Sequence, residues 1–516
     1  METSNEHPAL SPNGDRPGPE TGEQDAAPAA AAEAATAVAV LPRQPESFAL
    51  AIPASYEVVV GQDGHVYLAS RGPRNRRAFR VGGRQANLII REQLRQSGAK
   101  ATRADLAEFN DGLRAWAEAR APRRDVWFRV AQIAGGVEIA VYDDDDTRVR
   151  ITPGRVELVT EGSDTLFFRT STCKPLAVPA ASGDLGRLKR YVNLDAAQFV
   201  LLVAWLTYTL AHPKHPTTKF LILVLLGGQG AGKTFLEQLA KRLLDPDVIG
   251  VQRFPGSARD LAIAAQGAHV LAYDNLRGFH PAMADTLCNA STGGSFVTRA
   301  LYTNDEQAVL GLHCAIVLNG IHSFVDQPDL AQRCLPLHLP PIDESRRASE
   351  AELSAQLEAD LPAIQRGLYE KTAAILGHLD AAVVTSPERM VDFARWLAAM
   401  ELADGVGGDA YQSAYSDVLN EGQRDSLLDS LLGATVLQFA EKLDHRWSGT
   451  PAELLGELRD LVTLSTERSR DYPQNPIALS KRLAPLAAGL LTQGIEVQFS
   501  RGRSRLISIA RRGASK

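Results

Sequence analysis

The run FLILVLLGGQGAGKTFLEQLAKRL, residues 220–243, constrains the fold of this 516-residue chain more than any other segment. Residues 220–226 form a continuous apolar stretch, as expected for a strand that is covered on both faces of a parallel sheet. Residues 227–234 then fit the pattern G-x-x-x-x-G-K-[ST], and the residues after them repeat apolar side chains at helical spacing. The order of strand, glycine-rich loop and helix is the one that a phosphate-binding loop requires.

The chemistry of such a loop follows from its backbone. Glycines let consecutive N–H groups turn inward around the phosphates, at the positive end of a helix. Lys233 is expected to place its ammonium on the β- and γ-phosphate oxygens, and Thr234 to offer a hydroxyl ligand to Mg²⁺. The alternative is a glycine-rich turn without a ligand. With ATP and Mg²⁺ as the expected cofactors, the expected nucleotide contacts are Gly227, Gly228, Gln229, Gly230, Ala231, Gly232, Lys233, Thr234 and Phe235.

A second apolar strand is expected at residues 268–273, and it is followed by Asp274. A carboxylate at this place holds the magnesium ion of many nucleotide hydrolases (a Walker B acid), so Asp274 joins Thr234 as an expected metal ligand. The next residue is Asn275 rather than a glutamate, and an amide cannot accept a proton. Either turnover is slow or the catalytic base comes from elsewhere, with Asp285, Asp305 and Glu306 as candidates.

Two further residues are candidates for catalysis. Asn319 follows an expected strand at 315–318, where an amide can orient water or sense the γ-phosphate; the alternative is an Asn that starts a turn before Gly320. Arg333 is a candidate finger for the γ-phosphate of a neighbouring subunit, and the alternative is a surface salt bridge. The expected catalytic residues are therefore Lys233, Asp274, Asn319 and Arg333.

The order of these parts resembles superfamily 3 helicases of viruses, phages and plasmids, in which a Thr-Gly-Gly stretch, an Arg and a hairpin follow Walker B. The whole of 185–510 also resembles bacterial ATP-binding proteins found with primase–helicase genes of phages and mobile elements. The matching stretches are residues 273–278, 291–303, 317–321, 328–342 and 392–396.

The resemblance implies an AAA+-like ring, a hexamer, in which ATP moves DNA through a central pore. It places Arg299, Tyr302 and Asn304 on or near a pore hairpin, and the alternative is a plain hairpin at a subunit contact. The sequence departs from the family at Asn275, and no basic residue lies between Leu301 and Leu312.

The C-terminal residues suggest a second DNA-contact region. Residues 452–464 and 477–493 are expected to be helices, and 495–510 a hairpin, which together give a winged-helix pattern. The alternative is a winged helix that binds protein and carries a solvated basic tail. The basic residues expected on DNA are Lys481 and Arg482 in the second helix and Arg501, Arg503 and Arg505 in the hairpin.

Composition limits the remaining classes. The 55 basic and 61 acidic residues give a net charge of −6, which excludes a histone-like coat for DNA. The four cysteines show no C-x-x-C spacing, which argues against a zinc ribbon or a disulfide scaffold. Residues 199–210, the longest apolar stretch, are too few to span a bilayer, and no secretory leader is visible, so we expect a cytoplasmic protein without a membrane partner.

The expected fold class is α/β, a P-loop NTPase core of AAA+-like type flanked by other units. The expected units are a disordered acidic tail at 1–45, an N-terminal α+β domain at 46–175, a helical connector at 176–216, the ATPase core at 217–345, a helical lid at 346–435 and a winged-helix domain at 436–516.

The leading hypothesis is a Mg²⁺-dependent ATPase that oligomerises on DNA and acts as a replicative helicase of a mobile element or phage. Because residues 46–175 show no primase motif, a separate primase is an expected partner. One alternative is a nucleotide-gated DNA-binding switch with little ATP turnover, which Asn275 motivates. Another is an assembly ATPase that acts on protein.

Overall fold

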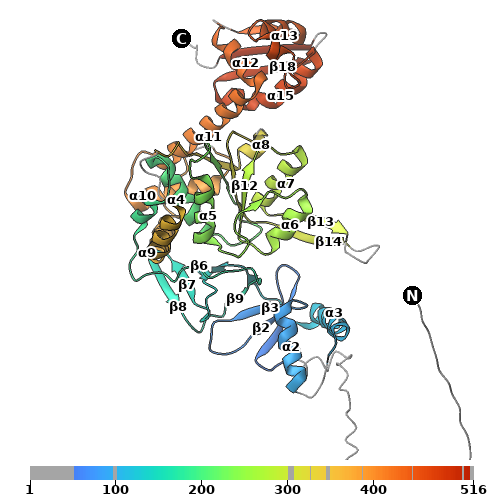
Figure 1. Ribbon diagram of the computed structural model, residues 1–516, viewed down its shortest axis with the longest axis vertical. Helices are drawn as coiled ribbons and strands as arrows, with labels where there is room; N and C mark the ends of the chain where they lie inside the picture. Colours follow the sequence, from blue (N-terminus) through green and yellow to red (C-terminus); the bar gives the residue numbers. More distant parts are fainter. Residues whose placement is uncertain are drawn as a thin grey trace, which may run out of the picture.

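The computed structural model describes residues 52–96, 101–299, 307–325, 327–343, 349–385, 388–443, 446–501 and 505–511. The chain is a mixed α/β protein whose parts follow one another along its longest axis (Figure 1). A strand-rich N-terminal part lies at one end, a central α/β part in the middle and a small C-terminal part at the other end. The N-terminal and C-terminal parts are therefore far from each other.

A parallel sheet forms the centre of the molecule. Within the described residues its strand order is β11-β12-β15-β10-β16, and every pairing is parallel. The expected strands are present with shifted bounds, because β12 and β15 continue past the polar residues that we expected to follow them. The strands are β10 (Ile222–Leu226), β11 (Gln252–Arg253), β12 (Val270–Leu276), β15 (Ala315–Gly320) and β16 (Cys334–His338).

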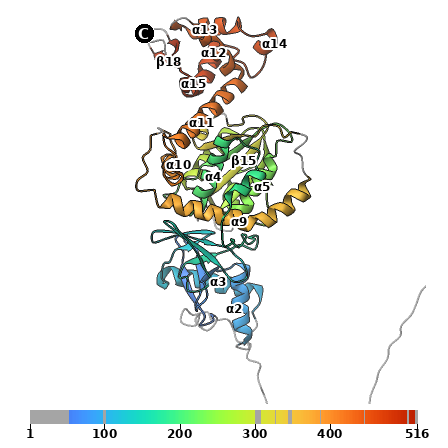
Figure 2. The same cartoon turned by 90° about the vertical axis from the view of Figure 1, so that its left-hand side faces the viewer.

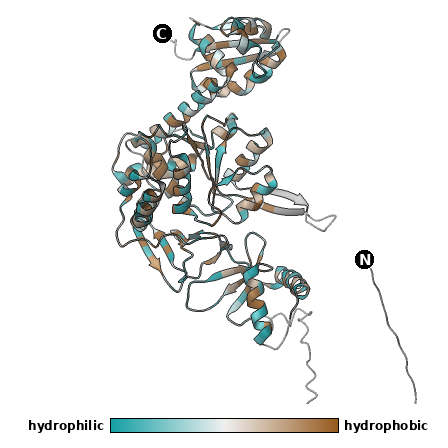
Figure 3. Cartoon of the chain, in the orientation of Figure 1, coloured by the Kyte–Doolittle hydropathy of each residue, from teal (hydrophilic) through white to brown (hydrophobic). Residues whose placement is uncertain are grey.

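Helices cover both faces of this sheet, which explains why its strands are apolar throughout. Alternate residues of β10 enter two different cores: Leu223 and Leu225 pack with the helices of one face, and Ile222 and Val224 with those of the other. Hydrophobic residues are accordingly concentrated inside the central part (Figure 3). The helices are α4 (Ala196–Ala211) and α5 (Lys233–Leu244) on the first face, and α6 (Ala258–Gln266) and α7 (Pro281–Thr292) on the second.

Helix α4 contains the longest apolar stretch of the sequence, residues 199–210. Asp195 is its N-cap and accepts a hydrogen bond from the Gln198 backbone N–H. Trp205 is fully buried and donates its indole N–H to the carbonyl of Leu221, which ties the helix to the first strand of the sheet. Among the described helices, none combines the length and the apolar character that crossing a lipid bilayer requires.

The N-terminal part contains two sheets. Four consecutive strands form an antiparallel meander, whereas the next strand, β9, pairs between β3 and β4 of the other sheet, a long-range choice that local patterns do not encode. The mixed sheet has the order β1 (Tyr56–Val60), β2 (Val66–Ser70), β3 (Arg77–Arg80), β9 (Leu166–Phe168), β4 (Val126–Trp127). The antiparallel sheet has β5 (Val130–Ile133), β6 (Gly136–Ala140), β7 (Arg148–Thr152) and β8 (Arg155–Val159) in sequence order. Helices α2 (Arg84–Gln96) and α3 (Arg103–Arg120) pack on the mixed sheet.

A buried ion pair joins the N-terminal part to the central part. Arg129, whose φ is +62°, donates from Nε to Asp245 Oδ1 at 3.0 Å, and neither side chain is more than 2 % exposed. Asp245 is the C-cap of α5, and its other carboxylate oxygen accepts the backbone N–H groups of His269 and Val270 at the start of β12. The junction between the two parts is therefore a structured interface rather than a linker.

Helices follow the central sheet and lead to the C-terminal part (Figures 1 and 2). The 3-10 helix η2 (Leu185–Arg190) precedes α4 and packs on α9. Figure 2 shows α9 crossing between the central and N-terminal parts, and α11 rising to the C-terminal part. The helices are α8 (Pro328–Ala331), α9 (Glu350–Leu376), α10 (Val391–Asp404) and α11 (Ala410–Asp429).

The C-terminal part has its own hydrophobic core. The expected helices and hairpin are present, together with a three-residue strand that the sequence analysis missed: β17 (Trp447–Gly449) pairs with β19. The remaining elements are α12 (Leu431–Glu441), α13 (Pro451–Arg459), α14 (Leu464–Glu467), α15 (Pro476–Thr492), β18 (Ile495–Arg501) and β19 (Arg505–Arg511). The order along the chain is helix, strand, helix, short helix, helix and hairpin.

A second hairpin projects from the central part (Figure 1). It pairs β13 (Gly294–Arg299) with β14 (Gln307–Leu312) in antiparallel register. The first strand was expected at 296–302, and residues 300–306 lie outside the described ranges.

Candidate nucleotide site and DNA-contact residues

The loop between β10 and α5 has the backbone that a glycine-rich anion loop needs. Gly227, Gly230 and Gly232 have φ values of +155°, +77° and +87°, which L side chains rarely adopt. A Cβ atom on Gly227 would lie 2.5 Å from the carbonyl oxygen of Leu339, so a larger residue does not fit there. Gly228, Gln229 and Gly230 are exposed, which leaves their N–H groups accessible at the start of a helix.

Lys233, the first residue of α5, folds back over this loop. Its Nζ donates to the carbonyl oxygens of Gly227 and Gly228 at 2.7 and 2.8 Å. Partial burial lowers the pKa of the ammonium, and the charge of Asp274 opposes that shift. The amine is therefore held at the mouth of the loop by neutral carbonyls that an anion can replace. Of the other expected contacts, Ala231 is buried, and Gly232 and Phe235 are half-buried.

The two expected magnesium ligands lie together. Thr234 Oγ1 donates to Asp274 Oδ2 at 3.2 Å, although 40 residues separate them in sequence. A hydroxyl and a carboxylate oxygen are the hard ligands that Mg²⁺ takes alongside water and phosphate oxygens. The pair therefore fits a magnesium ion bound mainly by nucleotide. Within the described ranges no group of three or more His, Cys, Asp or Glu could hold a metal by protein ligands alone.

Parallel pairing brings Asn319 beside the glycine-rich loop. Leu225 of β10 pairs with Asn319 of β15, two residues before the loop begins. Asn319 is 1 % exposed, and its Oδ1 accepts the backbone N–H of Asn275 at 3.1 Å. Asn275 has a φ of +62° at an irregularity of the β12–β15 ladder between Tyr273 and Leu276. The Asn319 amide thus stabilises the strained backbone directly after Asp274.

Glu237, which the sequence analysis did not single out, completes this network. It lies one turn after Lys233 in α5, is fully buried and accepts a hydrogen bond from Asn319 Nδ2. Burial, followed by the negative charge of Asp274, raises the pKa of Glu237 to about 8. Its Oε1 has no hydrogen-bond partner among the described residues. A buried acid without full satisfaction next to two expected catalytic residues indicates a functional constraint.

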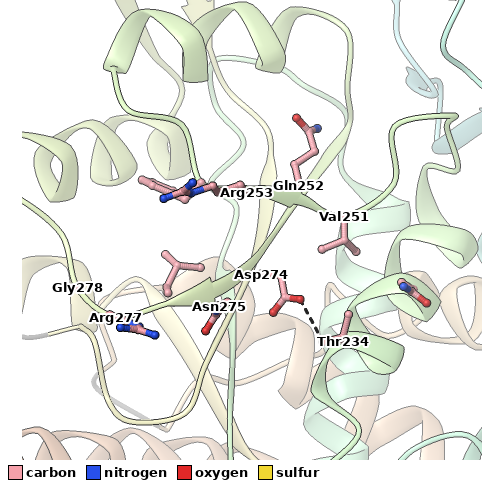
Figure 4. A pocket seen from close by; sticks show the side chains of 11 residues that line it. Thr234, Val251, Gln252, Arg253, Asp274, Asn275, Arg277 and Gly278 are labelled. Atoms are coloured by element: carbon pink, nitrogen blue, oxygen red, sulfur yellow. Dashed lines mark hydrogen bonds between the residues drawn. The ribbon is translucent and has the colours of Figure 1, made fainter. Parts of the chain in front are cut away.

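A pocket of about 910 Å³ adjoins Thr234 and Asp274 (Figure 4). Arg253 from the end of β11 and Arg277 after β12 line it, and Figure 4 shows both side chains across from the Thr234–Asp274 hydrogen bond. Neither arginine has an ion-pair partner within the part of the chain that the structure describes. Sequence reasoning missed both. The pairing of β11 with β12 brings Arg253 beside Asp274, whereas Arg277 follows Asp274 by three residues.

Arg333 lies away from the surface. Its side chain is 10 % exposed, forms an ion pair with Asp329 and donates to the Asp329 carbonyl at 2.7 Å. In this conformation the guanidinium is engaged within its own chain, so its role as a finger stays a prediction that needs a rearrangement. Of the candidate bases, Asp285 is exposed on α7, and Asp305 and Glu306 lie outside the described residues.

The expected DNA contacts are only partly described. Lys481 and Arg482 are exposed on α15, and Arg505 is exposed at the start of β19. Arg482 donates to the carbonyl of Arg470 at 2.9 Å. Arg501 and Arg299 end their strands, and nothing is described of their side chains; Tyr302, Asn304 and Arg503 lie outside the described residues.

Solved structures similar to this chain include the C-terminal region of NrS-1 in its apo form. That structure is 11 % identical, covers 89 % of this chain and 97 % of its own, and superimposes with a TM-score of 0.38. The JCV helicase, solved with a bound small molecule, is 16 % identical over 45 % of this chain and 67 % of its own, with a TM-score of 0.21.

A comparison with curated proteins finds no match. Two family models do match. The model for the actinomycete integrative conjugative element replication protein covers residues 185–421, which include the glycine-rich loop, Asp274 and Asn319. The model for the C-terminal domain of the same replication protein covers residues 432–516. These two matches span more than half of the sequence, and by them the chain belongs with the replication proteins of actinomycete integrative conjugative elements.

Proposed function

We propose that this replication protein is a Mg²⁺-dependent ATPase that acts on DNA, with a P-loop NTPase core of AAA+-like type. The observation that carries the proposal is the meeting of Lys233, Thr234 and Asp274 at the carboxyl edge of a parallel sheet, where open α/β sheets bind their ligands. The exposed N–H groups of the glycine-rich loop hold the phosphates, and Lys233 leaves its two carbonyl partners to contact them.

The remaining site residues complete the proposed chemistry. Thr234 and Asp274 would hold a magnesium ion, which when bound would supply positive charge next to the phosphates. Asn319, fixed by Glu237, keeps the backbone of Asn275 in place beside it. Arg253 and Arg277 supply positive charge on the open side of the same pocket. This arrangement binds and positions nucleotide without an acid directly after Asp274.

DNA contact is proposed at the C-terminal part. Helix α15 and the β18–β19 hairpin are arranged in the order of a winged helix, and Lys481, Arg482 and Arg505 are exposed on them. We propose that this unit docks on DNA while copies of the central part assemble into a ring and unwind it. A helicase of a mobile element is the function that unites the central part with the C-terminal part.

The second candidate is a nucleotide-gated DNA-binding switch. Asn275 favours it, because no carboxylate stands next to Asp274 to polarise the attacking water. Under this alternative ATP binds tightly but is turned over slowly.

ATP turnover by the full chain, with and without DNA, tests the proposal. We expect turnover that DNA stimulates, and we expect Lys233→Ala to lower it by about 100-fold or more, the cost of removing one charged phosphate ligand. Lys219→Ala, at an exposed lysine outside the site, is the matched control and should turn over ATP like the unsubstituted chain.

Saturable ATP binding with no turnover in the presence of DNA would favour the switch. Turnover that survives Lys233→Ala would contradict both candidates.

A further inference from the structure

The first section of the N-terminal part, residues 52–125, carries a positive charge that the proposed site does not use. The whole chain has a net charge of −6, but residues 52–125 contain 14 basic and 8 acidic residues, a net charge of +6. Thirteen of the 14 bases are arginines. Positive charge concentrated in one part of an acidic chain indicates binding of a polyanion.

Helix α2 presents part of this charge as one stripe. Arg84, Leu88, Arg91 and Arg95 follow one another at spacings of four, three and four residues, which places them on the same side of the helix. All four are exposed, and Leu88 is 55 % exposed. The opposite side of α2 is buried in the core of the N-terminal part through Ala86, Ile90 and Leu94. The side of α2 that packs in the core is therefore separate from the side that carries the arginines.

The arginines of the stripe are largely unneutralised. Within the described residues, Arg84 and Arg91 form no ion pair. Arg95 pairs with Glu92 at 2.7 Å, but both side chains are more than half exposed, so the pair is weak and open to exchange. Arg80, four residues before the helix, adds to the positive field: burial first, and then the charge of Arg80, lowers the pKa of His65.

We propose that Arg84, Arg91 and Arg95 bind the phosphate backbone of duplex DNA, as a second DNA-contact surface at the end of the molecule remote from α15. The inference rests on the proposed action on DNA and extends it to a part of the chain outside both matched families. Guanidinium groups bind phosphate oxygens in bidentate fashion. From Arg84 to Arg95 the helix rises about 16 Å, the rise of about five base pairs, so the three arginines can contact successive phosphates.

The test measures binding of the full chain to a labelled 30-base-pair duplex of arbitrary sequence, without nucleotide, at several KCl concentrations. The triple variant R84Q/R91Q/R95Q should lower the slope of log affinity against log salt by about 3, one for each lost phosphate contact. The control R120Q/R123Q/R155Q removes the same charge at exposed arginines outside the stripe and should change the slope by less than about 1. Both triple variants should unfold at the temperature of the unsubstituted chain.

An unchanged slope in the stripe variant, or equal changes in both triple variants, would overturn the proposal. A stripe variant that loses binding to polyglutamate but keeps its duplex slope would assign the stripe to an acidic protein and also overturn it. Failure of the proposed ATPase is distinguishable from failure of the stripe, because Lys233→Ala should lower ATP turnover and leave the salt slope of nucleotide-free DNA binding unchanged. The C-terminal contact is tested by K481Q/R482Q/R505Q, which should lower the slope independently of the stripe.

Discussion

The two edges of the central sheet each bury one carboxylate, and the two carboxylates differ in how completely they are hydrogen-bonded. At the amino edge, Asp245 is fully buried, and both of its carboxylate oxygens accept hydrogen bonds, one from Arg129 and the other from two backbone N–H groups. At the carboxyl edge, Glu237 is equally buried, but its Oε1 has no partner among the described residues. Nearby, Asn275 holds a positive φ that a non-glycine residue rarely adopts.

This difference separates a structural network from a functional one. A satisfied buried network makes a junction rigid, and burial of Asp245 is outweighed by Arg129 and Lys241, which hold its pKa below the usual value. An incompletely satisfied and strained network costs stability and persists where a ligand or a reaction uses it. The carboxyl edge should therefore become more stable when it is simplified, and the amino edge less stable.

The largest expected effect is at the amino edge. Arg129→Met removes one partner of the buried pair and leaves Asp245 and several carbonyl oxygens unsatisfied. We expect the free energy of unfolding to fall by about 3–5 kcal/mol, measured by urea titration. Arg155→Met makes the same chemical change at a side chain that is 70 % exposed and should cost less than about 0.5 kcal/mol. Equal losses in the two variants would remove the contrast between the edges.

At the carboxyl edge we expect a substitution to raise the free energy of unfolding rather than lower it. The raised pKa of Glu237 means that the folded chain holds a proton that the unfolded chain releases, so stability is lost as pH rises from about 4.5 through about 8. Glu237→Gln keeps an acceptor for Asn319 and removes this loss. Without nucleotide or magnesium, we expect the variant to be about 2 kcal/mol more stable at pH 7.5, with a smaller gain at pH 5. Destabilisation at pH 7.5 would show that Glu237 is structural.

The smallest effect concerns three histidines near the amino edge, of which His269 and His313 are buried and His212 is partly buried. Burial lowers the pKa of His212, His269 and His313 to about 4. Below pH 6.5 the unfolded chain takes up protons that these folded histidines do not, so their contribution to stability falls as pH falls. Each histidine should lower the free energy of unfolding by about 1 kcal/mol when the pH falls from 8 to 6. His313→Gln, which can still donate to the Thr218 carbonyl, should reduce this pH dependence by about that amount; an unchanged dependence would contradict the assignment.

The sequence was most informative where chemistry depends on local order. The glycine-rich loop and the polar ends of the strands at Asp274 and Asn319 follow from patterns within a few residues. Their spatial meeting follows from parallel pairing, since the carboxyl ends of parallel strands share one edge. The mixed α/β class was therefore predictable.

Features that depend on distant partners were not predictable. Glu237 resembles any charged residue of an amphipathic helix until Asn319 is brought against it from 82 residues away. Arg129 is one of many arginines in the N-terminal part, and its burial depends on Asp245, 116 residues later. The short strand β17 lacks the length that gives a periodic pattern, and its partner β19 is more than 50 residues away. Tertiary context decides each of these.

The proposed function requires that the loop after β10, with Lys233, binds the triphosphate of a magnesium nucleotide. This binding can be measured by isothermal titration calorimetry of the full chain with Mg²⁺-ATP. We expect saturable heat for the unsubstituted chain and for Lys219→Ala, and an affinity at least about 30-fold lower for Lys233→Ala, a loss of about 2 kcal/mol. No saturable heat in the unsubstituted chain, or equal affinity in all three proteins, would contradict the account.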